Sequence, residues 1–521
     1  MASKLFNGLI LLLCLGFSSL SFGAGVDESI NGSILPLAQR LSDFVFYKVD
    51  LGGVHLPIVV AWLVLGSIFC TIYFGFVNFR HFGLALRVIR GDYTDPNEPG
   101  EVSHFQALTA ALSGTIGIGN IGAVAVAVTV GGAGATLWMI LAGFLGMSLK
   151  FAECTLAVMY RRRNQDGSFS GGPMYYLADG PGAFPRLRRG FGGLYAFGII
   201  IGSFAIGNMF QSNQAFVQVV EATGGAGASW FADKGWLVGL IVSVFVGLVI
   251  IGGIKSIGRV TEKLVPMMAI LYLAFALGTI LFNWQAIPGA IAAIFVEAFN
   301  PQAVTGGILG GIIVGVQRAV FSNEAGLGSA AIAHSAVKTN NPATEGLVAM
   351  LGPFIDTVVI CTITALVIGT THVAAPGYLD SLGITGVAMT SAAISRNLGW
   401  APLPLMIVAA MFAFSTIISW AYYGLKGWSY LVGEGQGREK IFKLIYCSFV
   451  IIGAASSLET VLLIGDSFAF IICVPNIFAI LVMAPKVKEQ LATYIERVRS
   501  GQIPNYRKLE KLGRKPIEAL N

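Results

Sequence analysis

Two short stretches of the sequence combine glycines with polar side chains inside otherwise apolar segments. Residues 113–122 read SGTIGIGNIG and residues 321–329 read FSNEAGLGS, the second with an asparagine and a carboxylate. Each glycine costs a helix roughly 1 kcal/mol relative to alanine, so both stretches favour local unwinding. Unwound backbone is tolerated at membrane depth only where it lines a cavity. We therefore expect exposed amides and carbonyls here that could bind a substrate or an ion.

Close helix packing is the alternative explanation for glycine in apolar segments, because small residues let membrane helices approach each other. It suits Gly202 and Gly207, and also the pair Gly143 and Gly146. It suits the two stretches less well, since each of them adds a polar residue to the glycine cluster.

The elements that position these stretches are predicted to be membrane-spanning helices. Of 521 residues, 55% are hydrophobic and only 12% are charged, whereas about 25% are charged in a soluble domain. Apolar runs of about 20 residues match a hydrocarbon layer roughly 30 Å thick, and a transmembrane barrel would show short alternating strands instead. The composition excludes a soluble globular enzyme and predicts an all-α integral membrane protein. Eleven apolar segments are predicted, at 55–78, 105–130, 134–160, 192–220, 236–253, 262–282, 303–335, 344–370, 400–425, 441–457 and 459–484.

The positive charges indicate the orientation of these segments. With the mature N-terminus outside, 26 of the 33 lysines and arginines fall in inner loops and the C-terminal tail, and four fall in outer loops. This asymmetry is what the positive-inside rule predicts. The net charge of +6 is therefore explained by topology, and no nucleic-acid partner is expected.

The two glycine-rich stretches occupy matching places in the predicted topology. They lie in the second and the seventh of the eleven segments. If the first segment is set aside, they open two halves of five spans each, and an odd number of spans inverts one half relative to the other. Interrupted helices at equivalent positions of inverted repeats point to a substrate and ion site near the membrane midplane. The pattern predicts a secondary transporter.

The chain ends indicate where the membrane domain begins and ends, and the cysteines indicate whether disulfides or a zinc site are expected. Residues 1–24 have one lysine, a short apolar run and then small residues, which is typical of a signal peptide; an uncleaved short helix is the alternative. We expect a periplasmic segment at 25–54, a transmembrane domain at 55–485 and a basic cytoplasmic tail at 486–521, in the inner membrane of a bacterium. The six scattered cysteines predict neither disulfides nor a zinc site.

Several motifs resemble the alanine or glycine:cation symporter family, also called the sodium:alanine symporters. The resemblance covers residues from about 50 to 490 and implies a fold similar to the LeuT-type transporters, with a five-plus-five inverted repeat and one additional N-terminal helix. It also implies sodium-coupled uptake of small neutral amino acids such as alanine and glycine, with sodium as a co-transported ligand and no other cofactor. The motifs are GIGNIG at 117–122, GMSLKFAE at 146–153, GGPMYY at 171–176, FSNEAGLGS at 321–329, FIDT at 354–357 and FAFST at 412–416.

A zwitterionic amino acid needs hydrogen-bond donors for its carboxylate and acceptors for its ammonium group. Helix N-termini offer free amides and helix C-termini offer free carbonyls. The predicted substrate contacts are therefore the amides around Gly119, Asn120 and Gly122 and the carbonyls of Phe321, Ser322 and Asn323.

Three side chains are predicted to complete the substrate site. Asn120 can both donate and accept hydrogen bonds, and Gln211 resembles the family position that completes the pocket, although an interhelical hydrogen bond is the alternative. The Phe321 ring would limit the size of the substrate side chain, although an aromatic residue at helical spacing often only packs.

Sodium prefers oxygen ligands. The resemblance places a sodium site at the hydroxyls of Ser415 and Thr416 with carbonyls near Thr115 and Ile118. Such hydroxyls in a membrane helix also bond back to a carbonyl in the preceding turn, and this is the alternative explanation.

Intramembrane carboxylates are costly unless they are paired or functional. Glu324 and Asp356 are predicted to have structural or gating roles, with Glu324 capping exposed amides near its break. Glu153 is interpreted as a structural neighbour of Lys150, one helical turn away.

Other classes of protein fit the sequence less well. The five histidines form no H-E-x-x-H motif or paired spacing, so an intramembrane enzyme is not expected. A channel lined by glycine-rich segments and a proton-coupled transporter of the same fold are the two alternatives.

Overall fold

The computed structural model describes residues 25–50, 55–95, 97–181, 184–225, 227–300, 307–456 and 458–511. The predicted signal peptide at 1–24 lies outside these residues, as do positions 303–306 of the seventh predicted segment. Within the described part of the chain the fold is a helical bundle, with two small antiparallel hairpins, β1 (Lys48–Asp50) with β2 (His55–Pro57) and β3 (Arg162–Arg163) with β4 (Phe169–Ser170).

The helices of the N-terminal half include the first break. They are α2 (Gly25–Val45), α3 (Ile58–Tyr73), α4 (Val77–Arg80), α5 (Phe82–Ile89), α6 (His104–Thr115), α7 (Ile118–Gly131), α8 (Ala135–Met159), α9 (Pro173–Asp179), α10 (Pro185–Phe204), the π-helix η1 (Ala205–Phe210), α11 (Gln211–Ala222), α12 (Gly235–Ile250) and α13 (Gly253–Phe282).

The helices of the C-terminal half include the second break. They are the 3₁₀ turn η2 (Trp284–Ala286), α14 (Ile287–Ala298), α15 (Gly307–Asn323), α16 (Ser329–His334), α17 (Pro342–Ala349), α18 (Leu351–Pro353), the π-helix η3 (Phe354–Cys361), α19 (Thr362–Ala374), α20 (Tyr378–Ser381), α21 (Val387–Asn397), α22 (Pro402–Val432), α23 (Gln436–Ala455), α24 (Leu458–Arg499) and α25 (Tyr506–Lys511).

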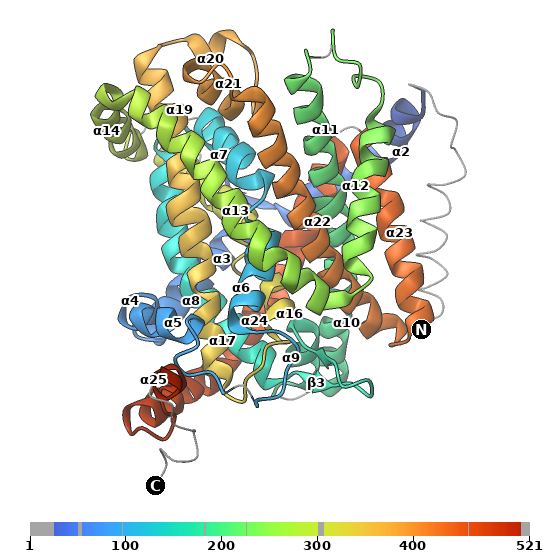
Figure 1. Cartoon of the computed structure of the whole chain (residues 1–521), viewed down its shortest axis with the longest axis vertical. Coiled ribbons are helices and arrows are strands. Elements are labelled where there is room, and N and C mark those ends of the chain that lie inside the picture. The colour runs from blue at the N-terminus through green and yellow to red at the C-terminus, as the bar shows by residue number, and fades with distance from the viewer. Residues whose placement is uncertain are drawn as a thin grey trace.

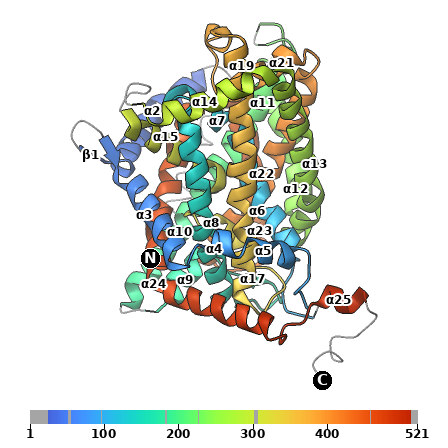
Figure 2. The same cartoon turned by 90° about the vertical axis from the view of Figure 1, so that its left-hand side faces the viewer.

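Most of the long helices run roughly along the long axis of the molecule (Figure 1). Helices α14, α20 and α21 lie at one end, and α4, α5, α9 and α25 lie at the other. The charge pattern predicts that this second end faces the cytoplasm, and we call it the inner end. After a turn of 90°, the last part of α24 runs across the inner end toward α25 (Figure 2).

The helices agree with the predicted all-α membrane class. By length and composition, six described helices could cross a membrane, or seven if the bent pair α6 and α7 is one span, and four further apolar helices are shorter. Leucines on the outside of the bundle are widely exposed, with Leu248 at 67% and Leu281 at 68%, as expected for a surface that lipid covers. The count of eleven spans and the inverted repeat stay predictions.

The structure also contains features that the apolar pattern did not indicate. Helix α14 with its short turn η2 is an apolar helix between the sixth and seventh predicted segments. The predicted segments 192–220 and 344–370 are not uniform helices, because the π-helices η1 and η3 interrupt them. Such π-bulges are frequent at functional sites.

Close packing explains the glycines for which it was expected. A Cβ on Gly207 would collide with Trp420, and one on Gly202 would lie 3.4 Å from the same ring. A Cβ on Gly146 would come within 2.9 Å of Ala325, directly beside the second break. Packing glycines therefore bring neighbouring helices against the broken ones.

Candidate functional site

The first break separates α6 from α7 and bends the chain by 44°. Ile116 and Gly117 are extended there, with φ/ψ of −73°/92° and −141°/−162°. The Gly117 amide donates to Oδ1 of Asn120 at 2.9 Å instead of continuing the helix. Asn120 therefore caps its own helix with its side chain, which leaves the first-turn amides of Ile118 and Gly119 outside the helical hydrogen-bond pattern.

Side chains of α22 bind the carbonyls that the first break sets free. Thr416 Oγ1 donates to the Ser113 carbonyl at 3.0 Å, and Trp420 Nε1 donates to the Gly114 carbonyl at 3.3 Å. In a continuous helix, the amides of residues 117 and 118 would bind these two carbonyls. The break is thus supported from a helix about 300 residues away in sequence.

The second break lies between α15 and α16 and is made by redirected amides. The Ala325 amide donates to Oδ1 of Asn323 at 2.9 Å, and the Gly326 amide donates to Oε1 of Glu153 at 2.8 Å. Glu324 has a left-handed backbone, with φ of +56°, which a residue with a Cβ rarely adopts. These bonds take the amides that would otherwise continue α15.

The last carbonyls of α15 differ in whether they can accept a hydrogen bond from a ligand. A continuous helix would direct the Ala325 and Gly326 amides to the carbonyls of Phe321 and Ser322, so the redirection releases those two acceptors. The Asn323 carbonyl instead accepts a hydrogen bond from Lys150 Nζ at 2.9 Å. Of the three carbonyls predicted to bind the substrate ammonium group, those of Phe321 and Ser322 are released from the helix and can accept a hydrogen bond from it. The third, of Asn323, already accepts one from the Lys150 ammonium group.

A buried polar network joins the two breaks. Asn120 Nδ2 donates to Ser322 Oγ at 3.1 Å and to the Asp356 carboxylate. Ser322 Oγ and Thr357 Oγ1 donate to Oδ2 of Asp356 at 2.7 and 2.8 Å. These four side chains are at most 1% exposed. Asp356, on η3, therefore connects α7 with α15, and the predicted site residues Asn120, Ser322 and Asp356 come together.

Four buried ionic groups surround the second break. Lys150 is 2% exposed. Its positive charge lies near enough to the carboxylates of Glu153, Glu324 and Asp356 to favour their charged forms. Glu324 accepts hydrogen bonds from Trp420 Nε1, at 3.1 Å, and from Ser329 Oγ. The region combines one positive and three acidic side chains in the interior of the bundle, where an unpaired charge is costly.

The structure gives two single carboxylates partners that the sequence interpretation did not include. Glu153 does more than lie next to Lys150: it is fully buried, and Oε1 accepts from the Gly326 amide and from Asn476 Nδ2 at 2.8 and 2.9 Å. Glu324 was expected to cap amides, but in the described part of the chain its carboxylate accepts hydrogen bonds from the side chains of Trp420 and Ser329. Glu153 binds the break's amide because it approaches from α8, whereas the side chain of Glu324 points to α22.

Gln211 and Phe321, which are predicted to complete the substrate site, lie beside the first break. Gln211 Oε1 lies 3.5 Å from the position of a Cβ on Gly117, is buried, and has no hydrogen-bond partner among the described residues. The Phe321 ring lies 3.4 Å from the position of a Cβ on Gly119 and packs edge-on against Phe210. An unpaired buried carboxamide oxygen and an aromatic wall therefore face the free amides of α7.

Gly122 lies apart from this group. It is the fifth residue of α7, beyond the first-turn amides that stay free. A Cβ on Gly122 would lie 2.8 Å from Val387 of α21, so its contact is with the helix at the outer end.

The residues predicted for sodium lie together beside the first break. Ser415 and Thr416 both donate to the Ser113 carbonyl, at 3.4 and 3.0 Å, and both also bond back to a carbonyl of α22 at 3.0 Å. Thr115 bonds back to its own helix at 3.3 Å, and Ile118 begins α7. The carbonyl that the structure brings to these hydroxyls is that of Ser113, which the sequence reasoning did not single out.

A cavity of about 490 Å³ lies beside the end of α15 that leads into the second break. It lies between α2, α15 and α24, and Phe321, Arg318 and Asp466 are among its lining residues. The Phe321 ring thus borders both this cavity and the first break.

A helical membrane bundle in which two broken helices face each other across a buried polar network defines a transporter of the broken-helix class. The chain belongs to the sodium:alanine symporter family, whose sequence model matches residues 44–508. The resemblance in the motifs is thereby confirmed.

Similar proteins agree with this assignment. The Sodium/alanine symporter AgcS of Methanococcus maripaludis is 38% identical over 453 residues, which cover 86% of this chain and 96% of that protein. The Amino-acid carrier protein AlsT of Bacillus subtilis is 32% identical and covers 86% and 91%. The crystal structure of MhsT in complex with L-phenylalanine has a TM-score of 0.52 at 13% identity, covering 76% of this chain and 99% of that one. This last likeness concerns the fold alone.

Proposed function

We propose that the protein is a sodium-coupled symporter that takes up small neutral amino acids, such as alanine and glycine, by alternating access. The observation that carries the proposal is the opposition of the two breaks. Free amides of α7 lie on one side and released carbonyls of α15 on the other, and Asn120, Ser322 and Asp356 hold them together. This arrangement suits a small molecule with a carboxylate and an ammonium group, because the amides can donate hydrogen bonds to the carboxylate and the carbonyls can accept them from the ammonium group.

The roles of the residues follow from this opposition. The amides of Ile118 and Gly119 would bind the substrate carboxylate, with the open oxygen of Gln211 beside them as an acceptor for the ammonium group. The carbonyls of Phe321 and Ser322 would bind the ammonium group as well. Asn120 acts through the backbone that it caps, since its own polar atoms are bonded within the protein.

The coupled sodium ion is proposed to bind next to the substrate. Thr416, Ser415 and the Ser113 carbonyl supply three oxygen atoms at the first break, and hard cations prefer such ligands. An ion there would stabilise the unwound backbone of residues 114–118. Sodium and substrate would then favour the same geometry of the break, which is a physical basis for coupling.

We further propose a bacterial inner-membrane location with the N-terminus outside and the C-terminus in the cytoplasm. Support comes from the charge asymmetry and from the broadly exposed apolar surface of the bundle. The periplasmic segment and the cytoplasmic tail follow from the same orientation, and the proposed signal peptide follows from the residue pattern of 1–24.

Reconstitution in liposomes tests the function. We expect labelled alanine to accumulate above its equilibrium level under an inward sodium gradient and to stop accumulating when choline replaces sodium. Accumulation driven by a proton gradient without sodium would support the proton-coupled alternative. Alanine flux that only equilibrates, with no response to any ion gradient, would support a channel.

A matched pair of variants connects the function to the site. Gln211→Ala should weaken alanine binding by about tenfold, because a buried hydrogen bond to a charged group contributes roughly 1.5–3 kcal/mol. Gln436→Ala removes the same side chain from an exposed position at the start of α23 and should leave binding unchanged. Equal affinities in the two variants would remove Gln211 from the site.

A further inference from the structure

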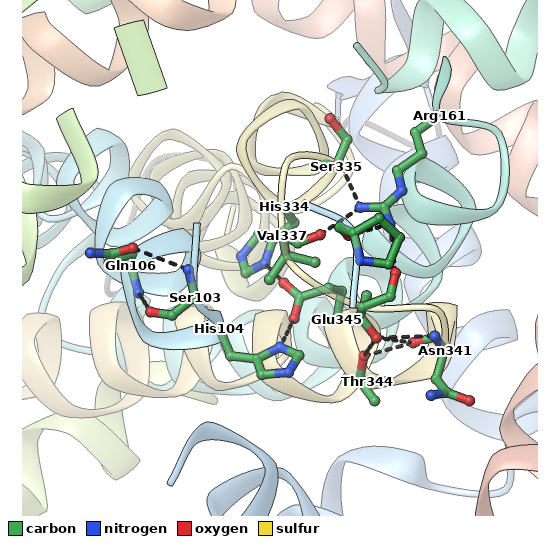
Figure 3. Close-up of polar contacts among 12 residues, drawn as sticks. Ser103, His104, Gln106, Arg161, His334, Ser335, Val337, Asn341, Thr344 and Glu345 are labelled. Atoms are coloured by element: carbon green, nitrogen blue, oxygen red, sulfur yellow. Dashed lines mark hydrogen bonds and ion pairs between the residues drawn. The ribbon is translucent and has the colours of Figure 1, made fainter. Parts of the chain in front are cut away.

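The inner ends of both broken helices meet at one buried carboxylate. Glu345 of α17 binds Nδ1 of His104, the first residue of α6, with one oxygen. Its other oxygen binds Nδ1 of His334, the last residue of α16, at 2.5 Å. The exposed fractions of the three side chains are 4% for His104, 1% for His334 and 0% for Glu345. Figure 3 shows the two imidazoles converging on this carboxylate.

Main-chain hydrogen bonds join the same two ends. The Glu101 amide donates to the Ala336 carbonyl at 2.7 Å, and the Lys338 amide donates to the Val102 carbonyl at 2.9 Å. Val102 and Val337 are partners in a parallel β-bridge. The segment that precedes α6 is therefore paired with the segment that follows α16.

A single guanidinium binds both segments as well. Arg161, just after α8, donates to the carbonyls of Ser335, Val337 and Thr339 at 3.0, 2.6 and 2.5 Å. It also donates to the Pro99 carbonyl, which lies ahead of α6, at 3.2 Å. The fan of bonds around Arg161 is visible beside Glu345 (Figure 3).

We propose that Glu345 is a positioning residue for transport, which joins the inner halves of the two broken helices so that α6 and α16 move as one body when the inner end opens. The proposal rests on the proposed function, because it concerns how that transporter alternates its access. Separation of α6 from α16 would leave a buried carboxylate without one imidazole and break the paired main chain, and unpaired buried groups are costly. Joint movement keeps all these bonds.

If α6 and α16 move together, the contacts that change when the inner end opens are those between this pair of helices and the helices around it. The contact of α6 with α13 is an example, in which Gln106 Nε2 donates to Glu262 at 2.9 Å. A Cβ placed on Gly258 of α13 would lie 3.4 Å from the Cβ of Gln106. The two helices approach closely there, but no paired main chain joins them in the described residues.

Two engineered disulfides separate these interfaces. Val102→Cys with Val337→Cys links the two inner ends to each other, and Gln106→Cys with Gly258→Cys links α6 to α13. In both pairs the two backbone segments lie in direct contact, as a disulfide requires. Each is made in the full chain with the native cysteines replaced, and sodium-driven alanine uptake is measured after oxidation and again after reduction.

We expect the oxidised Val102–Val337 pair to transport at about the rate of its reduced form, because its two ends never separate. The oxidised Gln106–Gly258 pair should lose about tenfold or more of its uptake and regain it on reduction, since moving interfaces gate transport. Loss of uptake on oxidation of the first pair, reversed by reductant, would overturn the proposal. So would undiminished uptake by the second pair.

A rescue experiment tests Glu345 itself. Glu345→Ala removes both imidazole contacts and should lower uptake by about tenfold or more, because each buried hydrogen bond to a charged group matters on that scale. The oxidised Val102–Val337 disulfide should restore most of it, because it replaces the lost connection. Absence of rescue would show that Glu345 does not act by joining the ends. If Glu345→Ala does not fold, His104→Gln is tested in the same way, because it removes the contact of Glu345 with α6 and keeps the contact with α16.

The unmodified chain is assayed in parallel. If it accumulates no alanine under a sodium gradient, the proposed function fails, and the disulfides are then compared in whichever flux the chain does support. A loss confined to the oxidised Val102–Val337 pair contradicts the joint movement alone.

Discussion

The two breaks solve the same problem with different chemistry. At the first, an uncharged side chain, Asn120, caps the amide of Gly117, and hydroxyl and indole donors of α22 bind the carbonyls. At the second, charged groups do this work: Glu153 accepts an amide and Lys150 binds a carbonyl. The side chains that bind the backbone of the first break are all neutral, whereas those that bind the backbone of the second include the ionisable Glu153 and Lys150.

This difference suggests a division of labour. Neutral dipoles leave room for an added cation, so the first break suits the sodium ion. At the second break, Lys150 and Glu153 already bind backbone groups and hold them in one geometry, and removal of one of these buried charges leaves the others uncompensated. We therefore expect changes at the second break to act mainly on folding, and changes at the first to act mainly on substrate and sodium affinity.

Lys150→Met should have the largest effect. Removal of this buried cation takes the donor from the Asn323 carbonyl and removes the positive charge that offsets the carboxylates of Glu153, Glu324 and Asp356. A buried charge left uncompensated is destabilising by about 3–5 kcal/mol. Thermal unfolding of the purified protein in detergent should show a large loss of stability. The double variant with Glu324→Gln should recover part of it, because one negative charge is removed as well. Equal stability of Lys150→Met and the unmodified chain would contradict the ionic account.

Glu153→Leu should have the next largest effect. The Gly326 amide and Asn476 would lose their common acceptor, and an unsatisfied buried donor costs about 1–3 kcal/mol. The freed amide can also rejoin α15 and cover the Ser322 carbonyl, so alanine affinity should fall together with stability. Glu153→Gln keeps an acceptor oxygen and serves as the control, for which a smaller loss in both quantities is expected.

The sequence was sufficient to locate both breaks, because glycine clusters and isolated polar residues mark them in local sequence. It was not sufficient to show what holds them open. The partner of Gly326 is Glu153, 173 positions away, and the donor to Gly114 is Trp420, 306 positions away. Asn120 was predicted to contact substrate by its type alone, whereas the fold uses its side chain within the protein. The His104–Glu345–His334 cluster escaped notice because its members share no motif spacing.

Asn120→Ala should affect binding more than folding. It removes the cap of Gly117 and the donor to Ser322 and Asp356, so the amides of α7 lose their fixed geometry. We expect alanine affinity to fall by about 10- to 100-fold, which corresponds to roughly 1.4–2.8 kcal/mol. Isothermal titration at saturating sodium measures this. A loss of stability as large as that of Lys150→Met, with affinity retained, would remove the distinction between the breaks.

Gly117→Ala should act selectively on sodium. The extended backbone of Gly117 suits alanine, but the new Cβ would lie 2.6 Å from Thr416 Oγ1 and displace it. The sodium concentration for half-maximal uptake should rise by about three- to tenfold, with alanine affinity at saturating sodium changed less, since displacement of one ligand oxygen weakens a hard-cation site. Unchanged sodium dependence would move the ion away from Thr416.

Gly122→Ala should have the smallest effect on transport, and it decides whether the site extends along α7. A methyl group at this position would meet Val387 Cγ2 at 2.8 Å, so the strain falls on the packing of α7 against α21. Such overpacking costs about 1–3 kcal/mol, and the β-branched side chain of Val387 has little freedom to shift. Stability should fall, and Val387→Ala in the same chain should restore part of it, because the space that Cγ2 occupied is then free while the Val387 backbone nitrogen stays 3.3 Å from the methyl position. Alanine and sodium affinities should match those of the unmodified chain throughout. An affinity loss that Val387→Ala does not repair would place the Gly122 amide in the substrate site after all, and would extend the neutral break by a full turn beyond the free amides of Ile118 and Gly119.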